Sequence, residues 1–482
     1  MGIGDIYRVG YAGMAAARTA MEVTGENISN VNTEGYSKQQ VNLATRFSIA
    51  PSGIDIGTGV EVTAVYRSYD NMLQQQLVNG KSTYQQNLTR QNALTQIQPS
   101  FNELNSNGLG ASLTSFFQAW QDLSANAQGS AERQALLSKS QILVDNFHNV
   151  AKSLTGVATV ADQSLVGISS EVTDNAKNIA VLNAQIISTV AAGGTPNTLY
   201  DQRDLLLQQM AEKVGISSTI QTDGTVTVAL SGGQQIVSGN KYATLYAQQN
   251  AAVPPTNDLY VTAIGAPPPS NNPLADTNVT ATVGGANNSM GKIGGTLQVR
   301  DSIVPGYMAK LDEMASSLVS SVNTAHAAGF DVNGNTGINF FNPAGTTAAT
   351  ISLAAGLTGN RIAAADTNPT LAGGGVANNV NARAIAGIAD TTYAFSTGSD
   401  TFAGFYETQV SQVGIDVQSA QNATNNGEGF LKQLGVLRSS VSGVSLDEEL
   451  TNLMQYQQAF QGAAKIVNTW SEMVDTLLGM VR

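Results

Sequence analysis

The longest regular pattern of apolar positions in the chain runs from Leu137 to Ile186. Steps of alternately three and four residues along this stretch give fifteen positions, of which thirteen are apolar. Such a seam is typical of a helix that packs lengthwise against its partners. A single helix of about 50 residues would be roughly 75 Å long, far more than a compact enzyme needs. The alternative is two shorter helices that break near Gly156 or Gly167.

Both ends of the chain repeat this pattern. Near the C-terminus, Ser445 and Glu448 have the spacing of a capping box, and nine of the eleven seam positions from Leu446 onwards are apolar. The N-terminal seam has small residues in its middle, which let a partner helix approach closely. We expect the terminal helices to pair with each other and with other copies of the chain; the alternative is an ordinary helix pair that closes a globular fold. The residues expected at the subunit interface are Ile6, Val9, Ala16, Val23, Leu446, Leu450, Leu453, Phe460, Val467, Val474 and Leu478.

Two stretches rich in glycine, threonine, asparagine and alanine interrupt the helical pattern, at about 215–300 and 331–402. In the first stretch, short alternating runs flank Asp223-Gly224, which is a β-hairpin signal. The prolines from Pro267 to Pro273 mark a loop in the same stretch. We therefore expect β-rich inserts between the helices.

Composition removes most familiar enzyme chemistries. Charged residues make up 12% of the 482 residues, about half of the roughly 25% usual in soluble proteins. The net charge of −12 disfavours a nucleic-acid surface or an anionic membrane as partner. The chain has no cysteine, which excludes disulfides, thiolate catalysis and Cys-ligated metal sites, and it has only two histidines. We expect no cofactor, no metal and no catalytic residue.

Motifs that imitate known sites each lack an essential residue. Asn79-Gly-Lys-Ser82 resembles the end of a phosphate-binding loop, but Gln75 stands where the first glycine of that loop must be. The run from Asp331 to Asn335 resembles the start of a calcium-binding loop, but the glycine and the glutamate of such a loop are missing further on, so a tight Asn-Gly turn is expected. For His148 and His326, we expect partly exposed positions on helices.

The N-terminus does not read as a cleaved leader. It lacks the basic region followed by a continuous apolar run that a secretory signal peptide has. No stretch approaches about 18 consecutive apolar residues, so we expect no transmembrane helix. These residues alone leave the compartment open.

Four blocks of sequence resemble the flagellar axial proteins, which are the rod, hook and hook-associated subunits. Residues 28–41, ISNVNTEGYSKQQV, resemble the N-terminal signature of this family, and residues 445–460, SLDEELTNLMQYQQAF, resemble its C-terminal partner motif. Two internal blocks are similar to the hook-associated subunits at the junction of hook and filament. They are LYDQRDLLL at 199–207, and GKIGG at 291–295 together with Arg300-Asp301, Pro305 and VNTAHAAGFD at 322–331.

The resemblance implies a structural subunit of the bacterial flagellum that forms the junction between hook and filament and serves motility. It implies export through the type III apparatus to the extracellular flagellum, without a cleaved signal peptide. The implied partners are the hook protein, the second hook-associated junction protein, other copies of the chain in a helical lattice, and an export chaperone at the C-terminal helix. No nucleic acid and no membrane insertion is implied. The terminal helices would be disordered in the free monomer.

Three other functions stay open from the sequence. Another axial protein, either the second junction protein or a flagellin-like subunit, would differ in the interface that it occupies in the flagellum. A type III translocator would insert amphipathic helices into membranes and cause liposome leakage. An enzyme carried on the β-rich insert would lose hydrolytic activity when acidic residues of the insert are changed.

The expected fold is mainly α with β-rich inserts. Residues 1–40 and 440–482 are expected to form a core domain of terminal helices paired as a coiled coil. Residues 41–212 and 291–439 are expected to form a long helical rod domain that is discontinuous in sequence and includes a β-rich stretch at 332–402. Residues 213–290 are expected to form an outer β-rich domain. Whether the two β-rich stretches form one domain or two stays open.

Overall fold

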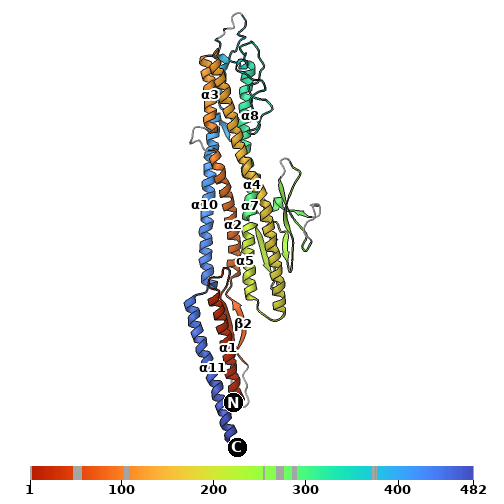
Figure 1. Cartoon of the computed structure of the whole chain (residues 1–482), viewed down its shortest axis with the longest axis vertical. Coiled ribbons are helices and arrows are strands. Elements are labelled where there is room, and N and C mark those ends of the chain that lie inside the picture. Colours follow the sequence, from red (N-terminus) through yellow and green to blue (C-terminus); the bar gives the residue numbers. More distant parts are fainter. Residues whose placement is uncertain are drawn as a thin grey trace.

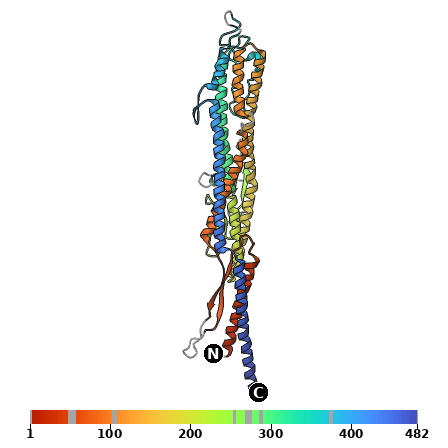
Figure 2. The same cartoon turned by 90° about the vertical axis from the view of Figure 1, so that its left-hand side faces the viewer.

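The molecule is a long helical rod with a small β-sheet region on one side. The computed structural model describes residues 3–46, 57–101, 108–252, 256–266, 276–284, 290–371, 375 and 377–480. Figure 1 shows most helices running along the long axis, and both termini at the same end. The view at right angles in Figure 2 shows that the rod is thin in the second direction as well. The mainly α fold with β inserts is confirmed.

Within the described residues, the rod is built from seven helices that come from three separate parts of the chain. The longest, α4, is one unbroken helix of 62 residues, so the two-helix alternative is wrong. Gly156 and Gly167 lie within it and face open space, where a glycine costs some helix propensity but opens no gap in the packing. The helices are α2 (Asn71–Ile97), α3 (Leu109–Ala125), α4 (Ser130–Ala191), α5 (Asn197–Lys213), α7 (Gly291–Gln298), α8 (Val304–Ala328) and α10 (Phe402–Ser442).

An aromatic core fills the end of the rod that lies away from the termini. Phe116 and Trp120 of α3 are fully buried against Phe340, whose ring centroid lies 5.3 Å from that of Trp120. His326 of α8 lies in the same core with no exposed surface. The expectation that this histidine is partly exposed is therefore wrong, because the segment after α8 folds back over it.

The segment from residue 331 to 401 holds less β-structure than the sequence predicts. Its described strands are β10 (Tyr393–Phe395) and β11 (Gly398–Asp400), which form one small hairpin. The rest consists of turns, isolated bridges and the short helices η4 (Gly359–Arg361), α9 (Val380–Ala386) and η5 (Gly387–Asp390). Side chains on α8 satisfy this backbone instead of partner strands: Asn323 accepts from the N–H groups of Phe340 and Phe341 and donates to the Phe341 carbonyl.

The first β-rich stretch forms two small antiparallel sheets that pack on α4. The sheet order is β3-β4-β5-β6 in one and β7-β8-β9 in the other. The hairpin predicted at Asp223-Gly224 joins β3 to β4, and Gly224 has a φ of +82°, which explains the glycine. Pro267–Pro273 lie outside the described residues. The elements are β3 (Ile216–Ile220), β4 (Val226–Leu230), β5 (Gln235–Ser238), β6 (Lys241–Tyr242), β7 (Leu245–Gln249), β8 (Asn257–Val261), β9 (Thr277–Asn278) and α6 (Thr280–Gly284).

A buried arginine fixes the second sheet to the rod. Between α7 and α8 the chain makes a π-helical turn, Val299–Ile303, which carries Arg300. The Arg300 guanidinium donates to Asp162 Oδ1 of α4 at 2.7 Å and to the carbonyl of Asn257 on β8 at 2.7 Å. Asp162 also accepts from the Asn257 N–H and side-chain amide. Because these bonds to the sheet come from a largely buried pair of charged groups, they hold the sheet in one orientation on α4.

The terminal elements form the narrow end of the rod. They are α1 (Ile3–Ser29), the antiparallel hairpin of β1 (Gln39–Thr45) and β2 (Val60–Arg67), and α11 (Leu446–Met480). In both views α1 and α11 lie side by side and run in opposite directions.

Candidate assembly interface

The two terminal helices approach each other through small residues. A Cβ atom on Gly10 would lie 2.8 Å from Val467 Cγ2, and one on Gly13 would lie 3.2 Å from Ala463 Cβ. Below this contact the ring of Tyr7 packs on that of Trp470, with centroids 4.7 Å apart. The N-terminal seam therefore has small residues in its middle because α11 sits directly on them.

The predicted interface residues divide into two sets. Ala16 is buried, and Ile6, Val9, Val23, Leu453, Phe460, Val467 and Val474 are half-buried. The four residues of this set on α11 recur every seven positions, and one of them, Val467, contacts α1 directly. Leu446, Leu450 and Leu478 form the second set and are 45%, 49% and 64% exposed.

The second set belongs to a larger apolar surface that the chain itself leaves uncovered. Eight large apolar side chains of α11 are between 41% and 78% exposed. Their spacing places Leu446, Leu450 and Met454 on one face of the helix and Ile466, Met473, Leu477 and Met480 on another, while Leu478 continues the seam that faces α1. Groups of large exposed apolar side chains are typical of binding surfaces. We call these residues the outer apolar surface of α11: Leu446, Leu450, Met454, Ile466, Met473, Leu477, Leu478 and Met480.

A buried polar joint fixes the helix pair at the base of the rod. Its centre is Asn27, which is 1% exposed and donates to the Gln39 carbonyl at 2.9 Å and to Glu449 Oε2 at 3.0 Å. The side-chain oxygen of Asn27, Oδ1, accepts from the Gln39 N–H at 2.9 Å and from the Tyr36 hydroxyl at 2.8 Å. One asparagine thus joins α1, the turn after it and α11.

Charged contacts connect the same joint to α11. Lys38 Nζ lies 2.8 Å from Glu448 Oε1 and 3.4 Å from Glu449 Oε1. Glu448 and Lys38 therefore form an ion pair between distant parts of the chain. The capping-box spacing of Ser445 and Glu448 does not predict Lys38 as a partner. The Lys38 N–H also donates to the Ser442 carbonyl at the end of α10.

The rod side of the joint is formed by α5. Asp201 accepts from the Ser37 hydroxyl at 2.8 Å, from the Ser37 N–H at 2.9 Å and from Arg67 Nη1 at 2.7 Å. Arg67 also pairs with Asp204 at 2.7 Å. Near the α10 end, Arg438 donates to the Gly35 carbonyl at 2.7 Å. These contacts fix the turn after α1 directly to the rod.

Burial sets the electrostatics of this cluster. It opposes the charge on Arg67, but the carboxylates of Asp204 and Asp201 outweigh that effect, so the pKa of Arg67 is raised. Burial raises the pKa of Asp204, although Arg67 and Arg203 counteract it. The charges are thus mutually dependent, and removing one would leave its partner buried without compensation.

Three blocks that are far apart in sequence converge at the joint. Residues 28–41 supply the turn, residues 199–207 supply Asp201 and Asp204, and residues 445–460 supply Glu448 and Glu449. Sequence reasoning treated these blocks as family markers and missed that they touch. It missed Arg67 entirely, because a single arginine at the end of a short strand carries no periodic signal.

The remaining candidate motifs have structural roles. His326 Nδ1 lies 2.6 Å from the Ile338 carbonyl, and its Nε2 accepts from the Ala363 N–H at 3.0 Å. Asp331 accepts from the N–H groups of Asn333 and Asn335 in a turn where Gly334 has a φ of +79°. Residues 79–82 lie within α2. Across the described ranges there is no cluster of three or more metal-ligating side chains, and no helix long and apolar enough to span a bilayer.

The thin rod, the paired termini and the uncovered apolar surface define the class of the protein as a structural subunit of a larger assembly. Models of known families agree. The model of the flagellar hook-associated protein FlgK helical domain matches residues 94–341. The flagella basal body rod protein model matches residues 8–36, and the flagellar basal body rod FlgEFG protein C-terminal model matches residues 437–480.

Full-length relatives give the same result. Flagellar hook-associated protein 1 of Bacillus subtilis is 29% identical, over 96% of this chain and 96% of its own length. Flagellar hook-associated protein 1 of Salmonella typhimurium is 26% identical, over 97% of this chain and 98% of its own length. The structure of the flagellar hook junction protein FlgK from Burkholderia pseudomallei shares the fold, with a TM-score of 0.66 at 16% identity. It covers 76% of this chain and 100% of that one.

The chain belongs to the flagellar hook-associated protein FlgK family. It is a structural subunit of the flagellum at the hook–filament junction and not an enzyme. The family model over the rod and the two models over the terminal helices meet close to the polar joint, which connects the corresponding parts of the molecule.

Proposed function

We propose that the subunit enters the flagellar tube through its terminal helix pair, with the outer apolar surface of α11 packing against neighbouring subunits. The observation that carries this proposal is the exposure of eight large apolar side chains on α11, which the packing of α1 leaves uncovered. A helix that packs on one partner needs one apolar stripe, so large apolar side chains outside that contact are expected where further partners bind.

The two sets of interface residues then have different tasks. Ala16, Val467 and the other half-buried residues hold α1 on α11 within one subunit. Leu446, Leu450 and Leu478 contact the next subunit. Full burial of a leucine is worth roughly 1.5–3 kcal/mol, so half-exposed residues contribute about half of that each. Several such contacts are enough to drive the addition of a subunit after the cost of ordering is subtracted.

The test is a charge placed on the outer apolar surface. Leu450→Asp removes an apolar contact and introduces a charge at a position that is 49% exposed, so the free subunit should keep its stability within about 0.5 kcal/mol. The same variant should fail to enter the junction and leave cells without filaments. We would measure incorporation by isolating hook–basal bodies and probing for the subunit. Gln455→Asp, at an exposed polar position on the same helix, is the matched control and should assemble normally.

Two outcomes would count against this assembly surface. One is normal incorporation of Leu450→Asp. The other is loss of the folded rod in that variant, because the residue would then be needed by the subunit itself. Limited proteolysis before and after assembly adds an independent measure, since α1 and α11 should be cut more slowly in the flagellum than in the free subunit.

The finer partners follow from the same surface. The hook protein and the second hook-associated junction protein are proposed as axial neighbours, and other copies of the chain as lateral neighbours in a helical lattice. Before assembly, an export chaperone on the outer apolar surface of α11 would prevent premature association. Export without a cleaved signal peptide through the type III apparatus is supported by the absence of cysteine, because no disulfide restricts unfolding.

The domain assignment is part of the proposal. Residues 1–40 and 440–482 form the assembling core domain, and residues 41–212 with 291–439 form the rod domain. Residues 213–290 form the outer domain. The position of the polar joint between α1, α11 and α5 supports the first boundary.

A further inference from the structure

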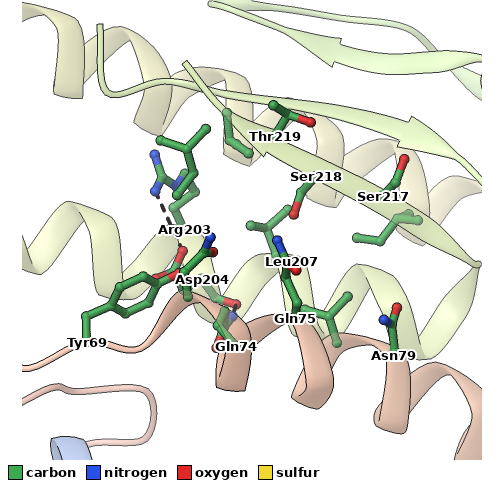
Figure 3. Close-up of a pocket in the computed structure, with 15 residues that line it drawn as sticks. Tyr69, Gln74, Gln75, Asn79, Arg203, Asp204, Leu207, Ser217, Ser218 and Thr219 are labelled. Atoms are coloured by element: carbon green, nitrogen blue, oxygen red, sulfur yellow. Dashed lines mark hydrogen bonds and ion pairs between the residues drawn. The ribbon is translucent and has the colours of Figure 1, made fainter. Parts of the chain in front are cut away.

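A cavity of about 430 Å³ lies between the rod and the edge of the first sheet. Figure 3 shows α2 below it, the strand β3 above it, and side chains of α5 at its back. The face towards solvent is open, because Gln75 and Asn79 of α2 and Thr219 and Ile220 of β3 are all exposed. The cavity is therefore a groove bordered by a helix on one side and a strand on the other.

The strand that borders the groove is an edge strand with unpaired backbone groups. Among the described strands, β3 pairs only with β4, and its register aligns Ile216 with Leu230 and Ile220 with Val226. The Gln221 N–H donates to the Thr225 carbonyl, and in an antiparallel ladder such bonded pairs alternate with unbonded ones. The N–H and C=O groups of residues 216, 218 and 220 therefore point away from β4, along the edge that borders the groove.

The helix opposite carries a ladder of side-chain amides. Asn71, Gln75 and Asn79 line the groove at intervals of four residues, so they lie on one face of α2 about 6 Å apart. An extended peptide repeats every two residues, or about 6.6 Å. The two repeats match closely over the roughly 12 Å from Asn71 to Asn79. A strand in the groove could thus bond to β3 through one edge and to the amide ladder through the other.

One end of the groove holds a buried guanidinium that pairs with Asp204 and has one N–H left unused within the described part of the chain. Arg203 of α5 lines the groove and is 1% exposed. Its Nη1 donates to the Gly224 carbonyl at 2.7 Å, while its Nε has no hydrogen-bond partner among the described residues. A buried guanidinium with an unused N–H favours an acceptor oxygen close by.

We propose that this groove binds an extended peptide segment of a neighbouring axial subunit, about four residues long, as an additional strand on the free edge of β3. An acceptor oxygen of that segment, a carbonyl or an acidic side chain, lies at the Arg203 end. The backbone of the segment supplies most of the contacts, as in other cases of strand addition. The identity of the neighbour rests on the proposed function, whereas the binding of a peptide strand does not.

The groove can be tested with a synthetic peptide on the full-length protein. The probe is the acetylated and amidated pentapeptide Val-Thr-Val-Thr-Asp, and its control is the same peptide with N-methyl groups on alternate residues. Residue-resolved hydrogen exchange should show that the probe slows exchange of the amides of Ile216, Ser218 and Ile220 at least about threefold, and that the methylated peptide does not. Equal protection by both peptides, or none at millimolar concentration, would overturn the proposal.

Variants distinguish the contribution of β3 to peptide binding from that of α2. Ser218→Pro removes one N–H that faces the groove but none that bonds to β4, and proline is tolerated at such edge positions. It should abolish protection, while Ser218→Ala keeps it. If Ser218→Pro impairs folding, the double change Gln75→Ala and Asn79→Ala is decisive: it should weaken peptide binding about threefold to tenfold. Gln76→Ala, a neighbouring exposed amide that does not line the groove, should leave it unchanged.

The neighbour is tested in isolated flagella. Since the chain has no cysteine, Ser218→Cys introduces a unique thiol in the groove. Its reaction with a maleimide should be at least about tenfold slower in flagella than in the free subunit, whereas the thiol of Gln235→Cys, at an exposed position on β5, should change less. Equal rates for the groove thiol in both states would show that no neighbour fills the groove. A subunit absent from the flagellum would instead contradict the proposed function, and the peptide result would stand.

Discussion

The upper rod, which is the end of the rod that lies away from the termini, and the terminal helix pair contain the same kind of apolar repeat. The repeat has a different role in each region. In the upper rod, Phe116, Trp120 and Phe340 are completely buried by segments of the same chain. In the terminal pair, the buried apolar residues among those described are all alanines, such as Ala16 and Ala20, while large apolar residues such as Leu450 stay half exposed. The comparison shows that a heptad pattern predicts a packed helix but does not tell which molecule supplies the partner.

The boundary between the two regions is polar rather than apolar. Arg67, Asp201 and Asp204 form a buried charge cluster between them, with side chains at most 9% exposed. Such clusters depend on geometry much more than apolar contacts do. We infer that the joint fixes the direction of the helix pair relative to the rod, and that each region gains its stability separately.

The largest difference should appear on truncation of one residue in each region. Phe340→Ala leaves a cavity among Phe116, Trp120 and Phe341 and should lower the free energy of unfolding of the rod by about 3–5 kcal/mol. Leu450→Ala should cost the free subunit less than about 0.5 kcal/mol. Urea unfolding can follow each region alone, because the two tryptophans lie in different regions, Trp120 in the rod and Trp470 in the pair. Similar costs for both variants would remove the distinction.

A slightly smaller effect is expected at the joint. Arg67→Met leaves the carboxylates of Asp201 and Asp204 buried without their cation, so the free energy of unfolding should fall by about 3 kcal/mol. The loss should be seen first as faster amide exchange in the turn around Ser37 and at the start of α5. Arg46→Met, which breaks an exposed pair with Glu61, is the control and should cost about 0.5 kcal/mol or less. A loss in the upper rod instead would mean that the regions are not separate.

Periodicity explains which parts of this fold are predictable from sequence. The long helix α4 and the pairing of α1 with α11 were predictable because each repeats one simple rule over many turns. The division of the α11 residues was not. Leu450 and Leu453 both fit a repeat of alternating threes and fours, and only the position of α1 decides that Leu453 faces inwards.

The polar joint and the aromatic core of the upper rod could not be predicted from the sequence for another reason. Ser37 and Asp201 are 164 residues apart, and no local pattern links two such positions. His326 lies on the buried side of α8, one helical turn after Val322, but a histidine is normally counted as polar. The composition of the stretch after residue 331 suggested strands, yet side chains such as Asn323 bind its backbone instead. In each case tertiary contacts override a local preference.

A change in pH should alter the stability of the upper rod and leave the stability of the terminal helix pair unchanged. The pKa of His326 is lowered from 6.5 to about 4, mainly by burial and in part by the nearby Arg133, against the opposing effects of the Ile338 carbonyl and Asp331. Between these values the unfolded chain binds a proton that the folded chain does not, so stability falls as the pH drops below 6.5. From about pH 7.5 to about pH 5 this residue should contribute a loss of about 2 kcal/mol. The pH dependence of Trp120 unfolding should be reduced by that amount in His326→Asn, whereas an unchanged profile would exclude His326 as its source.

The smallest effect we predict distinguishes two glycines of α1. Gly10→Ala places a methyl group 2.8 Å from Val467 Cγ2 and 3.3 Å from the Ala463 carbonyl oxygen, so α11 must move outwards, at a cost of about 1–2 kcal/mol. Gly25→Ala meets nothing within 4 Å and should instead stabilise the helix by up to about 1 kcal/mol. The fluorescence of Trp470, which packs on Tyr7 one helical turn before Gly10, reports the separation of the helices during unfolding. If both variants shift this transition in the same direction, helix propensity and not close packing governs the pair, and the small residues of the N-terminal seam would need another explanation.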